Sequence, residues 1–152
     1  MPEVKESGHN FRALGLIFIL AFLVALTILF TDKNLQTDFG IQHPYFIHWY
    51  GMLTIAIVSL IAGAVLLVQG RRSLGLAGTI GSSLLALFLI ADLATYSQVG
   101  FKSVSQFATY LFGVMKYPGS LSYIPGLYDL LFALFVIGAI VGAISLRSHK
   151  KA

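Results

Sequence analysis

Residues 12–30 read RALGLIFILAFLVALTILF and carry no charged side chain after Arg12. As an α-helix this segment is about 28 Å long, close to the roughly 30 Å hydrocarbon core of a bilayer. It is longer than the apolar region of a secretory signal peptide, and Thr31 and Asp32 follow it without the small residues of a cleavage site. The segment therefore predicts a retained membrane-spanning helix.

Three further apolar segments follow, at about residues 48–68, 74–96 and 127–146. The chain is 57% hydrophobic and 11% charged, whereas soluble domains are about one quarter charged. The connection between the second and third segments, residues 69–73, has room only for a hairpin between antiparallel helices. We therefore expect an all-α membrane protein in which residues 1–152 form a single domain, an antiparallel bundle of four transmembrane helices.

The basic residues are distributed unequally between the two ends of these segments. One side carries Lys5, Arg12, Arg71, Arg72, Arg147, Lys150 and Lys151, and the other carries Lys33, Lys102 and Lys116. Because lysine and arginine near the ends of spans are retained in the cytoplasm, we expect a multi-pass protein of the cell membrane with both termini cytoplasmic. The net charge of +4 is then accounted for by topology and anionic headgroups, so nucleic acid is not an expected partner.

The second outer loop, residues 97–126, contains a helical pattern of its own. Ser103 and Gln106 have the spacing of a capping box. Apolar side chains then recur at helical spacing, at Val104, Phe107, Tyr110, Leu111, Val114 and Met115. We expect a short amphipathic helix over about 103–116 that lies on the membrane surface.

Small residues gather in the cytoplasmic halves of three spans. Since lipid tails are as apolar as leucine, helices in a bilayer associate where small side chains let backbones approach. The expected packing residues are Ser59, Gly63, Gly78, Ser82, Gly138 and Gly142, of which the last two form a GxxxG motif. The outer halves carry larger residues, which either leave a cavity open to the outside or fill the space themselves.

A candidate polar site lies at the outer ends of three spans. His48 begins the second span, Asp92 lies near the outer end of the third, and Asp129 is in the first turn of the fourth. His43 precedes the second span and can add a ligand from the loop. An imidazole and two carboxylates at one membrane level can hold a divalent metal, relay protons, or bind a quinone or lipid headgroup.

Each member of this set also has a structural interpretation. Asp129 favours the positive end of a helix dipole, Asp92 can reach the headgroups or local hydrogen-bond donors, and His48 can serve as an interfacial hydrogen-bonding residue. The sequence leaves both interpretations open because it does not specify how each helix is rotated.

Several chemistries have no support in the residues. Cysteine is absent, which removes disulfides, thiolate metal sites and a cysteine nucleophile. Haem b between spans needs histidines in two helices, a retinal Schiff base needs a lysine within a span, and nucleotide phosphates need a glycine-rich loop followed by lysine. We therefore expect neither haem b within the spans nor retinal nor a nucleotide.

These features favour a protein that acts mainly through association. We expect an accessory, non-catalytic subunit of a larger membrane complex, with the bilayer and other membrane subunits or further copies of itself as partners. The reasons are spans nearly free of polar groups, the GxxxG surface of the fourth span, and aromatic outer loops suited to an interface. The alternative is an outward-facing polar site in a transporter component or a small membrane enzyme.

Overall fold

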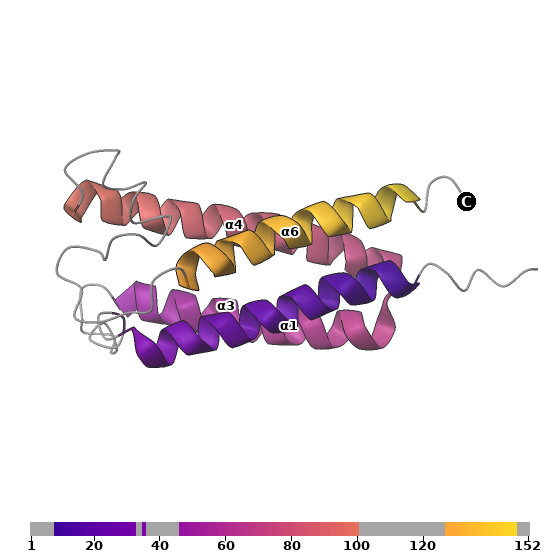
Figure 1. Ribbon diagram of the computed structural model, residues 1–152, viewed down its shortest axis with the longest axis horizontal. Coiled ribbons are helices and arrows are strands. Elements are labelled where there is room, and N and C mark those ends of the chain that lie inside the picture. Colours follow the sequence, from indigo (N-terminus) through magenta and orange to yellow (C-terminus); the bar gives the residue numbers. More distant parts are fainter. Residues whose placement is uncertain (1–7, 33–34, 36–45, 101–126, 149–152) are drawn as a thin grey trace, which may run out of the picture.

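The computed structural model describes residues 8–32, 35, 46–100 and 127–148. Four helices make up this part of the chain (Figure 1): α1 at Gly8–Thr31, α3 at Phe46–Gln69, α4 at Arg72–Gly100 and α6 at Leu127–Ser148. The predicted surface helix over 103–116 lies outside the described residues.

All four helices are long and apolar enough to cross a membrane. The spans are Phe11–Thr31, Trp49–Gln69, Arg72–Ile90 and Leu127–Ser148. The prediction of an all-helical, multi-pass membrane protein is confirmed at this level. The helices extend beyond the predicted apolar segments by up to four residues at either end, because hydropathy marks the apolar stretch and not the last backbone hydrogen bond.

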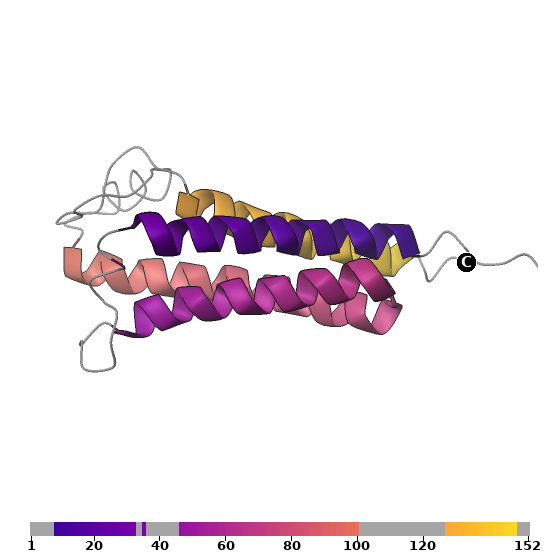
Figure 2. The ribbon, with the colours of Figure 1, turned by 90° about the horizontal axis from the view of Figure 1, so that it is seen from below.

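The helices lie side by side and alternate in direction along the long axis of the molecule (Figures 1 and 2). Helix α1 packs extensively on both α3 and α6, and α4 packs mainly on α6. The interfaces of α4 with α3 and with α1 are much smaller. Helix α1 is therefore the centre of the packing, whereas α3 and α4 each have one large interface within the described part.

The interior of the described part is filled by large apolar side chains. Helix α1 contributes a stripe at helical spacing that includes Phe11, Leu14 and Phe18. The ring of Phe18 meets that of Phe135 from α6, tilted at 57° with 6.2 Å between centroids. Phe135 and its neighbour Leu131, one turn earlier, are both 0% exposed. Bulky side chains of α1 and α6 thus meet in this interface.

The outward faces of the helices are apolar as well. Phe30 and Val68 are 73% and 78% exposed, and large aliphatic residues of all four helices share this surface. A monomeric protein in water rarely presents so continuous an apolar surface. A lipid environment explains it, since exposed aliphatic side chains are stable in contact with acyl chains.

Glycines allow two helix pairs to approach closely. A Cβ added to Gly15 of α1 would lie 3.1 Å from the carbonyl oxygen of Gly63 in α3, and one added to Gly63 would lie 3.1 Å from the carbonyl oxygen of Gly15. On the other side of the bundle, a Cβ at Gly138 would lie 2.5 Å from the Ser82 hydroxyl oxygen, and one at Gly142 would overlap Thr79. The GxxxG face of α6 is therefore occupied within the chain, by α4.

The connection between α3 and α4 consists of Gly70 and Arg71. Gly70 has a φ of 53°, a left-handed conformation in which a side chain is strained. Its amide donates to the carbonyl of Leu66 at 3.0 Å, which closes the last turn of α3. The chain can therefore reverse direction within two residues.

Candidate functional site

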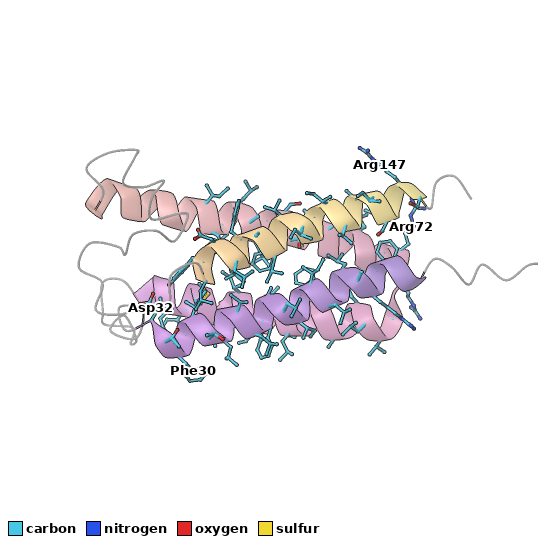
Figure 3. All side chains as sticks on the ribbon, viewed as in Figure 1. Phe30, Asp32, Arg72 and Arg147 are labelled. Atoms are coloured by element: carbon cyan, nitrogen blue, oxygen red, sulfur yellow. The ribbon has the colours of Figure 1, made fainter. Side chains whose placement is uncertain are left out.

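A buried carboxylate lies where α1 ends. Asp32 is 7% exposed. Its Oδ2 accepts a hydrogen bond of 2.9 Å from the hydroxyl of Tyr128 in α6, and its Oδ1 accepts one of 3.3 Å from the backbone amide of Leu35. Figure 3 labels Asp32 at the end of the bundle where α3 and α6 begin. The side chain thus ties the first and last helices together.

Three of the predicted site residues, His48, Asp92 and Asp129, lie on helices at this same end of the molecule. Asp129 is the third residue of α6, next to Tyr128, and its side chain is half-buried. His48 is the third residue of α3, and Asp92 lies in α4 eight residues before the helix ends at Gly100. The side chains of His48 and Asp92, and all of His43, lie outside the described part. Whether the four residues share a site stays a prediction.

No group of three or more metal-type side chains occurs among the residues that the structure describes. Of the described carboxylates, Asp32 accepts hydrogen bonds from the hydroxyl of Tyr128 and from the backbone amide of Leu35. This arrangement can hold a carboxylate in a fixed position at this end of the bundle.

Hydropathy alone gives no sign that Asp32 is buried, because this residue lies outside the apolar segments, where an acid is ordinarily solvated. The available signal was positional: Asp32 follows the first span and Tyr128 begins the fourth, so an antiparallel arrangement brings both to one membrane level.

Two buried serines form a second set of polar groups, midway along the bundle. Ser59 of α3 and Ser82 of α4 are both 0% exposed, and neither hydroxyl has a hydrogen-bond partner within the described part. A serine in an apolar helix usually donates to the carbonyl four residues earlier, as Ser145 does to Val141 at 2.7 Å. Ser82 lies against Gly138, so its small size serves the contact between α4 and α6.

A groove of about 520 Å³ lies at the opposite end of the bundle. It is lined by Arg72, Ser73 and Leu76 from the start of α4 and by Leu146 and Arg147 from the end of α6. Figure 3 shows both arginines at this end, on two different helices. The groove combines two positive charges with an apolar wall.

Comparisons with protein-family models, with curated proteins and with solved structures find no match to this chain.

Proposed function

We propose that this chain is an accessory, non-catalytic subunit of a larger membrane complex, and that α4 carries the contact with its partner. The observation that carries the proposal is the unequal packing of the four helices. Within the described part, α3 and α4 each make one large interface, α3 with α1 and α4 with α6, and of these two helices α4 is the one with a glycine, Gly81, that faces open space. A helix covered on one side alone keeps most of its apolar surface for lipid or for another protein.

The exposed face of α4 has the character of a helix-packing surface. Ala77, Gly81 and Leu84 fall on one side of the helix at spacings of four and three residues. Ala77 and Leu84 are exposed, and a Cβ added to Gly81 would have no atom within 4 Å. Small residues beside large ones let a second helix approach the backbone and interlock with it. This combination supports a transmembrane helix of another subunit, or of a second copy, as the partner.

The glycines of α6 refine the original expectation about where association takes place. The GxxxG motif is expected to pack against another helix, either within the chain or in a partner, and Gly138 and Gly142 lie against Ser82 and Thr79 of α4. A partner cannot use the same face. The proposed contact is therefore on α4.

Two matched glycine substitutions test the proposal. Gly81→Leu places a large side chain in open space, so we expect normal folding and loss of the partner. Gly138→Leu places the same side chain against Ser82 and Leu14, so we expect loss of the fold itself. The measurements are thermal stability and the mass of the particle extracted from membranes in mild detergent. Isolation of the wild-type chain as a lone monomer in detergent and in nanodiscs would contradict the proposal.

A second candidate function is a polar binding site at the end of the bundle that holds Asp32. The observation that favours it is the buried acid at that end, Asp32, which accepts a hydrogen bond from Tyr128. Tyr128 is next in the chain to Asp129. The site would then coordinate a metal, relay a proton, or bind a quinone or a lipid headgroup. The side chains involved would be those of His48, Asp92, Asp129 and His43. In that case Mn²⁺ or Zn²⁺ should raise the thermal stability of the wild type, and Asp92→Asn should fold but lose the increase. An identical response of the variant would rule out this site.

A further inference from the structure

The groove between the start of α4 and the end of α6 has a chemical character that differs along its depth. Arg72, Ser73 and Arg147 are exposed residues at the terminal turns of their helices, whereas Leu76 lies one turn further into α4. Leu76 is 49% exposed and shares the groove with Leu146. A ligand that fills the groove therefore meets positive charge and a hydroxyl at the edge of the bundle and aliphatic surface below.

The charges at this end favour an anion. Asp32 and Asp129, the acids whose side chains the structure describes, belong to the other end of the bundle. The groove opens at the N-terminus of α4 and at the C-terminus of α6, whose helix dipoles are opposite in sign, so the two guanidinium groups determine the charge of the groove. Guanidinium groups from two helices can grip one phosphate from two sides, and arginine is well suited to phosphate because its donors form a planar fork.

The leucines decide between a free anion and a lipid. A small hydrated anion gains no binding energy from aliphatic surface, and an acyl chain alone gains none from two arginines. A volume of about 520 Å³ falls within the usual range of small-ligand sites. It accommodates a phosphate and glycerol with the beginning of an acyl chain, whose remainder extends beyond the groove into the hydrocarbon core.

We propose that this groove binds one anionic glycerophospholipid, with its phosphate between Arg72 and Arg147 and an acyl chain against Leu76 and Leu146. The lipid belongs to the leaflet on the side of both chain termini. In the expected orientation this is the cytoplasmic leaflet, which carries the negative surface potential. The proposal is independent of the partner proposed for α4, because it concerns the end of that helix and not the face around Gly81.

The test compares two pairs of arginine substitutions in the full chain. Arg72→Gln with Arg147→Gln removes both charges of the groove. Arg12→Gln with Arg71→Gln removes two exposed charges from the same end of the bundle without changing the groove lining. Phosphatidylglycerol is the probe and phosphatidylcholine the neutral control, and the readout is the number and retention of bound lipids by native mass spectrometry.

We expect the wild type and the Arg12/Arg71 double variant to retain one phosphatidylglycerol and to release phosphatidylcholine. Loss of both groove charges should weaken retention of phosphatidylglycerol by about thirtyfold. Leu76→Ser should weaken it as well, although no charge has changed. Equal losses in the two double variants would overturn the proposal by showing a general effect of surface charge.

Two further measurements distinguish a bound lipid from a bound inorganic anion and locate the lipid on the chain. Inorganic phosphate at millimolar concentration should not displace the lipid, and displacement together with stabilisation by phosphate alone would overturn the lipid assignment. A photoreactive phosphatidylglycerol applied to the wild type should crosslink to residues 72–76 or 146–147. This measurement does not depend on the folding of any variant, and crosslinks confined to other segments would overturn the proposal.

Discussion

Gly15→Ala is the substitution whose consequence follows most directly from the geometry. The new Cβ would lie 3.0 Å from the backbone nitrogen of Leu67 and 3.1 Å from the carbonyl oxygen of Gly63. These are backbone atoms of α3, so no side-chain rotation can relieve the contact. Helices α1 and α3 must separate by about 0.5 Å to restore ordinary van der Waals distances, which weakens dispersion along the interface.

The magnitude is a balance of two terms. Overpacking of this kind destabilises by about 1–3 kcal/mol. Replacement of a helical glycine by alanine returns about 0.5–1 kcal/mol through backbone entropy. We therefore expect a net loss of up to about 2.5 kcal/mol in the free energy of unfolding.

The matched control is Gly81→Ala, because a Cβ at Gly81 would have no atom within 4 Å. This variant gains the entropic term without the steric cost, so its stability should equal or exceed that of the wild type by up to about 1 kcal/mol. Unfolding by increasing fractions of denaturing detergent in mixed micelles can be followed through Trp49, the one tryptophan in the chain. Unfolding of Gly15→Ala and Gly81→Ala at the same detergent fraction would refute the inferred close approach of α1 and α3.

Further predictions concern the core, the Asp32 contact and the orientation. Phe135→Ala, at a residue 0% exposed, should destabilise by roughly 2 kcal/mol in the same titration, less than in a soluble core because the membrane reference state is itself apolar. Tyr128→Phe removes the hydroxyl that donates to Asp32 and should cost about 1–2 kcal/mol; no change would mean that another group replaces it. Cysteines at Ser73 and Ser148 should resist impermeant thiol reagents in intact cells while one at Ser105 reacts, and labelling of Ser73 from outside would reverse the orientation.

The four spans could be predicted because the bilayer imposes a length and a composition on any helix that crosses it. Residues 12–30 meet both requirements without reference to the rest of the chain. The ends of the helices could be predicted less precisely. Helix α4 continues to Gly100, past the predicted limit at Tyr96, because helical hydrogen bonding does not stop where the sequence becomes polar.

The contacts between helices depend on rotation about each helix axis, which hydropathy does not contain. Helices α1, α3, α4 and α6 are apolar on nearly every side, so no amphipathic stripe indicates the inward face. Gly63 was expected to pack closely, but its partner Gly15 is an isolated glycine in α1 and gave no signal. Because the rotation of each helix is unknown from the sequence, the grouping of His48, Asp92 and Asp129 could not be decided. The pairing of Asp32 with Tyr128 could not be predicted for the same reason.

The two-residue connection at Gly70 has a consequence for how the protein reaches its membrane. The connection between helices α3 and α4, Gly70 and Arg71, is too short for one helix to insert into the bilayer far ahead of the other. We expect the two helices to insert together as a helical hairpin, with Arg71 and Arg72 at the surface. A bulky residue at Gly70 would therefore act on biogenesis first, by slowing the closure of this pair and increasing the fraction of chains degraded before assembly.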